Sequence, residues 1–192
     1  EIPIDALASN APQYNRKWTK TKLPEKKINT KDLKKIKLED ALIKILSSPN
    51  QSNKSWVTEQ FDQMVMTDTA QRSGGNAAII RVHKKEKAIA VTVDSSANYC
   101  KAHPLSGGKQ IVCESWRNLI SVGAKPIAIT NCLNFGNPEN PKVMGEFAEC
   151  LLGIKEACEF LDYPVVSGNV SFYNGTNKKN IDPTPVIGGV GL

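Results

Sequence analysis

The alternation of apolar and polar positions becomes regular after the glycine pair at 74–75. Residues 76–82 and 87–94 are rich in Ala, Ile and Val, and a short polar turn at 83–86 separates them. Such runs predict two strands joined as a hairpin. Further apolar segments at 125–135 and 184–192 predict strands, and the segment 164–173 predicts a buried strand.

Two helices are expected between these strands. Residues 108–122 have apolar side chains at helical spacing and end at Gly123, a frequent residue after a helix. A longer helix is indicated by apolar positions that follow one another at steps of three and four: Met144, Phe147, Leu151, Ile154, Cys158 and Leu161. The order strand, strand, helix, strand, helix, strand, strand predicts an α/β fold, namely an α+β two-layer sandwich with a mixed sheet and helices on one face.

The first third of the chain lacks this regularity. Residues 1–30 are rich in Pro, Asn and Lys, which favours a linker or extended strap. Thr30 is a candidate cap for a connecting helix that includes Leu33 and Ile36 and ends before Pro49. Residues 56–68 alternate weakly and indicate a strand or a docking arm. We therefore predict a basic linker with a connecting helix at 1–55 and one domain at 56–192.

Charge separates the same two regions. The chain carries a net charge of +6, and residues 1–60 hold 12 Lys and Arg against 7 Asp and Glu. No aromatic residues are interleaved with the lysines at 26–37, so a solvated helix face is favoured over nucleic-acid binding.

Composition narrows the cellular setting. No apolar run approaches the ~20 residues of a membrane span, and no export signal begins the chain. Five cysteines without a CxxC pair argue against disulfides or a zinc site and favour the cytoplasm. The chain begins without Met and ends in an apolar, Gly-rich segment, so we expect a piece of a longer protein.

Glycines and polar residues at strand ends carry the candidate chemistry. Eleven of the 13 glycines follow residue 106. Among them, Gly107-Gly108, Gly136 and Gly168 are candidates to face a phosphate because glycine lets the backbone approach a ligand. Neither a P-loop nor a GxGxxG motif is present.

Several polar residues interrupt apolar strands, where an unpaired polar group costs roughly 1–3 kcal/mol. They are Asp94, Asn131, Asn134, Ser167, Asn169 and Ser171. Each is either held in an internal hydrogen-bond network or faces a cleft and contacts a ligand. Amide and carboxylate oxygens suit Mg²⁺ beside a triphosphate.

Four segments carry a family resemblance: GGKQIVCESWRNLISVGAKPIAIT, TNCLNFGNPENP, PVVSGNVSFYN and TPVIGGVGL. They resemble the second ATP-binding half of PurL-type phosphoribosylformylglycinamidine synthases, whose fold is similar to the N-terminal domain of aminoimidazole ribonucleotide synthetase. The resemblance runs from about residue 38 to the end.

The resemblance implies an ATP-dependent C–N ligase of purine biosynthesis. It implies that formylglycinamide ribonucleotide becomes formylglycinamidine ribonucleotide, with ammonia from a partner glutaminase subunit and a small bridging subunit in the complex. It also implies ATP and Mg²⁺ as cofactors. By position, Asn131 and Gly168 are expected to contact ATP, Asn169 to bind Mg²⁺ and Ser171 to contact the substrate. Asp94 and Asn137 are expected only as supporting residues.

No catalytic residue is assigned within the chain. The family's general-base histidine belongs to the first half of the enzyme, so His83 and His103 are expected in turn or surface roles and the fragment alone is expected to be inactive. Relatives often have an acidic residue at the position of Asn131 and a basic residue before Tyr99. These departures keep a second hypothesis open, a structural module with a vestigial nucleotide site. A selenophosphate synthetase or hydrogenase maturation factor is a weaker alternative, and pairing with a second copy through an exposed sheet is also expected.

Overall fold

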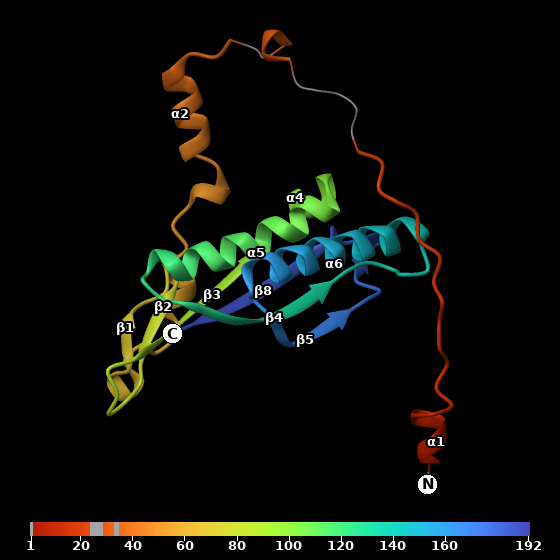
Figure 1. The fold of residues 1–192 in the computed structure, drawn as a ribbon. Helices are drawn as coiled ribbons and strands as arrows, with labels where there is room; N and C mark the ends of the chain where they lie inside the picture. The colour runs from red at the N-terminus through yellow and green to blue at the C-terminus, as the bar shows by residue number, and fades with distance from the viewer. Residues whose placement is uncertain (1, 24–28, 33–34) are drawn as a thin grey trace.

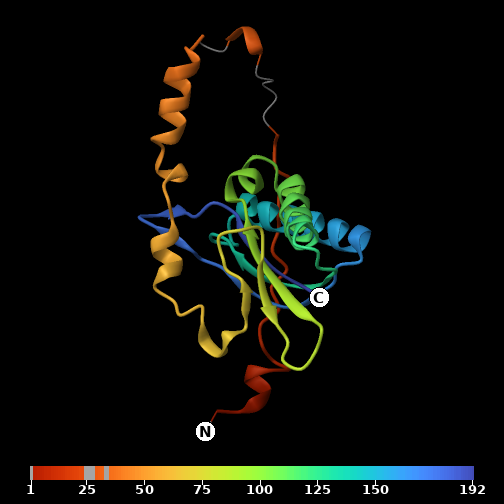
Figure 2. The same ribbon diagram turned by 90° about the vertical axis from the view of Figure 1, so that its left-hand side faces the viewer.

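A computed structural model describes residues 2–23, 29–32 and 35–192 (Figure 1). Its centre is a six-stranded mixed sheet with the order β1-β2-β3-β8-β4-β5. The strands are β1 (Thr69–Gln71), β2 (Ala78–Arg81), β3 (Ala88–Ser95), β4 (Pro126–Asn134), β5 (Val165–Ser171) and β8 (Thr184–Gly191). Three helices accompany them: α4 (Ala97–Ala102), α5 (Pro104–Ser121) and α6 (Pro141–Leu161). Helices α5 and α6 lie side by side on one face of the sheet, which confirms the predicted two-layer fold (Figures 1 and 2).

All neighbouring strands of the sheet are antiparallel except β4 and β5, which run parallel. The last strand of the chain, β8, lies between β3 and β4. Its side chains alternate between buried and partly exposed positions, and Ile187 is fully buried. The final segment of the sequence therefore completes the middle of the sheet.

The helix layer is held together by close backbone contacts. A Cβ at Gly108 of α5 would collide with the carbonyl oxygen of Cys150 in α6, and a Cβ at Gly153 of α6 would collide with the carbonyl oxygen of Leu105 in α5. Because glycine has no side chain, the helices can approach at these two positions until backbone contacts backbone. The prediction that Gly107 and Gly108 face a phosphate is wrong, because both are buried inside α5.

The core lies between this helix layer and the sheet. It contains apolar side chains from both helices and the central strands, among them Ile111, Leu119, Ile129, Leu133, Ile154 and Ile187. The ring of Phe147 packs edge-to-face against Phe135 and Phe172, with ring centroids 5.1 and 4.9 Å apart. The predicted apolar face of the long helix is thus confirmed.

The open face of the sheet has no helix layer. On this face, Val93 of β3 keeps 71% of its surface exposed, and Ile80 of β2 keeps 40%. The segment 164–173 forms the expected strand, but the prediction that it is buried is wrong. Strand β5 lies at the edge of the sheet, so its apolar side chains stay exposed although the sequence is typical of a buried strand.

The segment before the domain differs from its prediction. The connecting helix, α2 (Leu38–Leu46), begins eight residues after Thr30, because Thr30 lies in the single turn η1 (Thr30–Asp32) and Lys37 is extended. Ile36 precedes the helix, and Leu33 lies outside the described residues.

Residues 56–68 contain no strand. They include most of helix α3 (Ser55–Glu59) and the turn η3 (Val65–Thr67), in which Met66 has a φ of 55°. Weak alternation alone was a poor indicator here, since a left-handed residue ends any extended run. Two other short elements, α1 (Ile4–Leu7) and η2 (Pro49–Gln51), also lie in this part. Within the described ranges, no helix has the length and apolar character needed to cross a bilayer.

Part of the segment predicted as a linker or strap is extended and lies against the start of α6. The backbone N–H of Thr19 donates to the carbonyl of Pro141 at 3.0 Å, and that of Thr21 donates to the buried carboxylate of Glu149 at 2.9 Å. Gly145 lies directly under this contact, because a Cβ there would collide with the carbonyl oxygen of Thr19. We call residues 14–23 the strap.

The contact between α5 and α6 predicts the effect of Gly153→Ala. Alanine in a helix interior is normally favoured over glycine by about 1 kcal/mol, but here the added methyl group meets the Leu105 carbonyl. We expect the free energy of unfolding to fall by about 1–3 kcal/mol, measured by urea denaturation. Lys155→Ala on the exposed side of α6 is the control and should change stability little. Equal stability of Gly153→Ala and the wild type would contradict the close contact.

Candidate functional site

The parallel strands β4 and β5 end at the same edge of the sheet. Asn131 pairs with Gly168, Cys132 with Asn169, and Asn134 with Ser171. The carboxyl ends of adjacent parallel strands are a frequent place for ligand binding in α/β proteins. The four predicted site residues therefore lie on two neighbouring strands within four consecutive register positions.

Asn131 and Gly168 lie on the helix-covered face of the sheet. Asn131 pairs with the fully buried Ile187, and residues paired across strands share a face. A Cβ at Gly168 would collide with Oδ1 of Asn131, so the two residues are in direct contact. Gly168 is thus needed to accommodate the Asn131 side chain.

Asn169 and Ser171 lie on the open face. A shallow hollow of about 310 Å³ lies beside them, lined by Val93, Thr130, Asn131, Cys132, Asn169, Val186 and Gly188. The hydroxyl of Ser167 on this face donates to Thr130 Oγ1 at 2.8 Å. A ligand in the hollow would contact the Asn169 amide directly. The Asn131 side chain lies on the opposite face of the sheet, so the ligand would contact it only by extending past the exposed edge of β5.

Hydrogen bonds divide the polar strand residues into two groups. Asn134 donates to the carbonyl oxygens of Cys132 and Thr184 at 3.2 and 3.3 Å. In contrast, Asn131 and Asn169 make no side-chain hydrogen bond within the described part of the chain. The internal-network interpretation thus applies to Asn134, and the Asn131 and Asn169 amides remain free for a ligand.

Asp94 belongs to the first group. Its carboxylate accepts a hydrogen bond from Thr92 Oγ1 at 2.9 Å and one from Asn118 Nδ2 of α5 at 2.7 Å. Burial raises the pKa of Asp94, and these two hydrogen bonds oppose that rise. Asp94 faces the helix layer on β3, with β8 and β4 between it and β5. Its carboxylate is thus held by internal hydrogen bonds and lies apart from the ends of β4 and β5.

Two asparagines that the sequence analysis did not select organise the loops beyond the strand ends. Asn174 Nδ2 donates to the carbonyls of Phe135 and Ser171 and to Ser171 Oγ, at 3.1, 3.0 and 3.0 Å. Asn180 Oδ1 accepts from the backbone N–H of Asn137 at 3.0 Å. These bonds tie the loop after β4 to the loop after β5.

A small hairpin positions Asn180. Strands β6 (Gly175–Thr176) and β7 (Lys179–Asn180) are joined by two residues with positive φ, Asn177 and Lys178. This is the backbone of a type I′ turn. The side chain of Asn180 occupies the space next to Gly136, so Gly136 accommodates a protein side chain here. The Asn-Gly pair at 174–175 lies before β6 and not at the turn, so it did not mark the turn in the sequence.

The donor set suits a metal ion that arrives with phosphates. Asn169 and Ser171 offer neutral oxygens, and no cluster of three His, Cys, Asp or Glu that could hold a metal occurs in residues 2–23, 29–32 and 35–192. Mg²⁺ in proteins usually takes one or two carboxylates together with water or substrate phosphates. A metal ion at the strand ends would therefore need further ligands, such as phosphate oxygens or water.

The two histidines lie at a turn and before a helix, away from the ends of β4 and β5. His83 lies at the turn between β2 and β3, where its Nε2 contacts a carboxylate oxygen of Asp68. His103 precedes α5, and its Nδ1 accepts from the backbone N–H of Ser106 at 3.3 Å.

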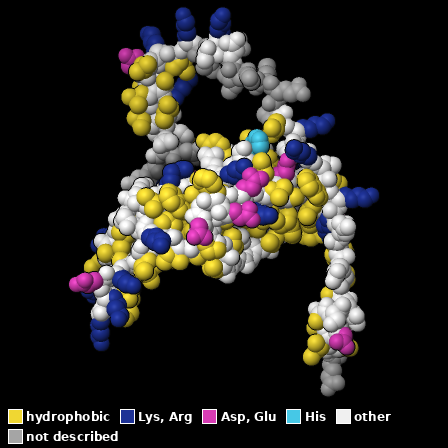
Figure 3. Space-filling model, viewed as in Figure 1, with side chains coloured by type: hydrophobic (Ala, Val, Ile, Leu, Met, Phe, Trp, Pro, Cys, Tyr) yellow, Lys and Arg dark blue, Asp and Glu magenta, His cyan; other side chains and the backbone are white. Residues whose placement is uncertain are grey.

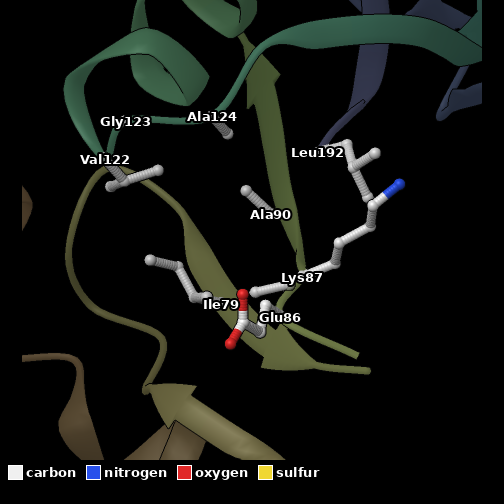
Figure 4. A pocket seen from close by; sticks show the side chains of 9 residues that line it. Ile79, Glu86, Lys87, Ala90, Val122, Gly123, Ala124 and Leu192 are labelled. Carbon is white, nitrogen blue, oxygen red and sulfur yellow. The ribbon is translucent and has the colours of Figure 1, made fainter. Parts of the chain in front are cut away.

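A separate hollow of about 360 Å³ lies at the other end of the sheet (Figure 4). It is lined mainly by small and apolar residues, including Ile79, Ala90, Val122 and Leu192, with Glu86 and Lys87 at one side. It contains none of the predicted site residues.

A mixed sheet covered on one face, with free polar groups at the ends of two parallel strands, defines a two-layer α/β domain suited to binding a ligand at its sheet edge. Residues 74–192 match the family model described as AIR synthase related protein, N-terminal domain. The chain therefore belongs to the AIR synthase related family.

Comparison with individual proteins refines this placement. The whole chain is 61% identical to a phosphoribosylformylglycinamidine synthase subunit PurL from Pelagibacter ubique (strain HTCC1062), of which it covers 26%. The structure of PurLQS from Thermotoga maritima matches 99% of the chain and 29% of its own length, at 34% identity and a TM-score of 0.75. Structures of T. maritima PurL complexed with ATP and with FGAR match with TM-scores of 0.71 and 0.69. The chain thus spans about a quarter of the length of the relatives that it matches.

The environment of Asp94 predicts a pH effect on stability. Folding raises its pKa above the usual 3.8, so the folded state holds the proton more tightly than the unfolded state. The stability that this tighter proton binding contributes to the folded state is full below pH ~3.8, and it is lost as the pH rises through the raised pKa. Relative to Asp94→Asn, the wild type should therefore lose stability from about pH 4 upward.

Urea unfolding of both proteins between about pH 4 and 7 tests this. The exposed Asp40→Asn on α2 is the control and should follow the wild type. A stability difference between wild type and Asp94→Asn that is independent of pH would contradict the proposed proton linkage.

Proposed function

We propose that this chain is the second-half ATP-binding domain of a PurL-type phosphoribosylformylglycinamidine synthase. The reaction is the ATP-dependent conversion of formylglycinamide ribonucleotide to formylglycinamidine ribonucleotide with ammonia from glutamine. The observation that carries the proposal is 61% identity with a PurL subunit along the entire chain. The ATP and FGAR complexes of the T. maritima protein support the same substrates here.

The proposed residue roles follow the strand ends. Asn169 supplies an amide oxygen to a Mg²⁺ ion carried by the ATP phosphates, and Ser171, two residues further on the same face, contacts the ribonucleotide substrate. Asn131 and Gly168 contact ATP around the exposed edge of β5. The free Asn131 and Asn169 amides support these roles, since amides without internal partners can exchange water for a ligand at low cost.

ATP-dependent phosphorylation of an amide oxygen places negative charge on the transferring phosphoryl group. Asn169 would hold a metal ion that could stabilise that charge, while the residues at the strand ends orient the reacting groups. In the described residues of this chain, no histidine is placed as a general base at the strand ends. We therefore propose that the proton-transferring residue comes from another part of the enzyme and that this chain alone does not turn over.

The proposal extends to assembly and location. The open face of the sheet presents exposed apolar side chains such as Val93 and Ile80, so we propose that it pairs with a second sheet of the same kind, from the same enzyme or from a second copy. The glutaminase and the small bridging subunit are proposed as partners, and the cytoplasm as the location. The five cysteines, all free in the structure, agree with a reducing compartment.

The proposal is tested with Asn169→Ala in the full-length protein that carries this sequence. Loss of a metal-ligating oxygen should lower kcat/KM for ATP by about 100-fold, measured as formation of formylglycinamidine ribonucleotide from ATP, Mg²⁺ and ammonia. Ser167→Ala is a matched control, because Ser167 lies on the same strand and face but bonds to Thr130. Equal activity of wild type and Asn169→Ala would refute the metal role, and absence of synthase activity in the wild type would refute the function.

A second candidate is a structural module with a vestigial nucleotide site. It is favoured by one observation, the lack of a carboxylate among the residues lining the strand-end hollow. Calorimetry of the full-length protein with Mg-ATP distinguishes the two. Binding that Asn169→Ala and Gly168→Val together abolish would exclude a vestigial site, whereas unchanged binding would favour it.

A further inference from the structure

Another cavity, separate from the two hollows described above, lies where the strap crosses helices α4 and α6. It has a volume of about 640 Å³ and is lined by Thr19, Lys20, Thr21, Lys22, Lys101, Ala102, Lys142 and Glu146. Four of the eight lining residues are lysines from three separate chain segments. The volume lies within the range of about 300–1,000 Å³ that is usual for small-ligand sites.

The positive charge of this cavity is only partly neutralised. Lys101 forms an ion pair with Asp182 at 2.7 Å. Within the described residues, no ion pair involves Lys20, Lys22 or Lys142. Glu146 is the single acidic residue of the lining, and burial raises its pKa while the nearby Lys142 lowers it. Lysines therefore outnumber carboxylates around the cavity even when Asp182 is counted.

The lysines from the strap are held at the cavity by backbone contacts. Thr19 and Thr21, on either side of Lys20, donate their N–H groups to Pro141 and Glu149 of α6. Gly145 gives the space for this contact. Dark-blue Lys and Arg side chains stand along the strap on the right of Figure 3. A preformed arrangement of this kind reduces the entropy that is lost when a ligand is bound.

A further polar group of the lining lacks a partner. The hydroxyl oxygen of Thr21 is buried and makes no hydrogen bond within the described part of the chain. A buried hydroxyl without a partner is unfavourable, and an acceptor atom in the cavity would relieve it after a small rotation of the side chain.

We propose that this cavity is a binding site for a phosphate-bearing anion. Lysine ammonium groups bind phosphate as point charges, and a threonine hydroxyl adds a hydrogen-bond donor. The site shares no lining residue with the strand-end hollow and does not depend on the proposed synthase function. The phosphate comes either from an inorganic ion or from a nucleotide.

Calorimetric titration of the full-length protein that carries this sequence, with inorganic phosphate as the probe, tests the proposal. The double variant Lys20→Gln, Lys142→Gln should weaken binding by about tenfold or more, because two unpaired charges are removed. Glu146→Gln should tighten binding by about threefold, because it removes the one opposing charge of the lining. Lys155→Gln, further along α6, is the matched control and should bind as the wild type does.

A gain in affinity cannot result from misfolding, so Glu146→Gln keeps the test decisive even if the lysine variants are unstable. Gly145→Ala adds an independent test: its methyl group should displace the strap and weaken phosphate binding with all four lysines present.

A titration with AMP distinguishes the two sources of phosphate. AMP that binds no more tightly than phosphate identifies an inorganic ligand, and tighter AMP binding that the double lysine variant removes identifies a nucleotide. Absence of phosphate binding at about 10 mM, or equal binding by wild type, double variant and Glu146→Gln, would overturn the site.

Discussion

The close contact between helices α5 and α6 is the constraint on which the rest of the structure depends. Gly108 and Gly153 bring each helix against a backbone carbonyl of the other, and a side chain at either position would separate the helices. With the two helices packed this tightly, their combined apolar faces cover one side of the sheet around Ile129, Leu133 and Ile187. A similar close contact occurs at Gly145 of α6, where the contacting backbone belongs to the strap and not to a helix.

A layer of two helices leaves the other face of the sheet and the edge strand β5 open. Asn169 on the open face and Asn131 beside the edge strand make no side-chain hydrogen bond within the described part of the chain, so both amides can bind solvent or a ligand. The loops that follow β4 and β5 are fixed by Asn174 and Asn180. The candidate site therefore has hydrogen-bonded loops at the strand ends and a sheet face that no helix of the described residues covers.

The two proposed binding regions use different chemistry. At the strand ends, neutral amide and hydroxyl oxygens suit a metal-bound phosphate chain. Because these oxygens carry no negative charge, they do not repel the phosphates that bind the same cation. At the strap, lysines and a hydroxyl suit a bare phosphate. Two segments of α6 support these regions indirectly: its first turns hold the strap, and its later turns pack against α5.

The sequence by itself determined the layer architecture and the order of its main elements. Periods of two and of three to four residues depend only on which side chains must be buried, so the hairpin of β2 and β3 and the apolar face of α6 could be predicted. The family resemblance gave the candidate residues Asn131, Gly168, Asn169 and Ser171. Tertiary structure alone decided that β8 lies in the middle of the sheet, that β5 is exposed at its edge and that Asn131 and Asn169 point to opposite faces. It also decided which glycines pack against backbone and brought Lys20, Lys101 and Lys142 to one cavity. Local periodicity does not encode these outcomes, because they depend on which distant segments become neighbours when the layers pack.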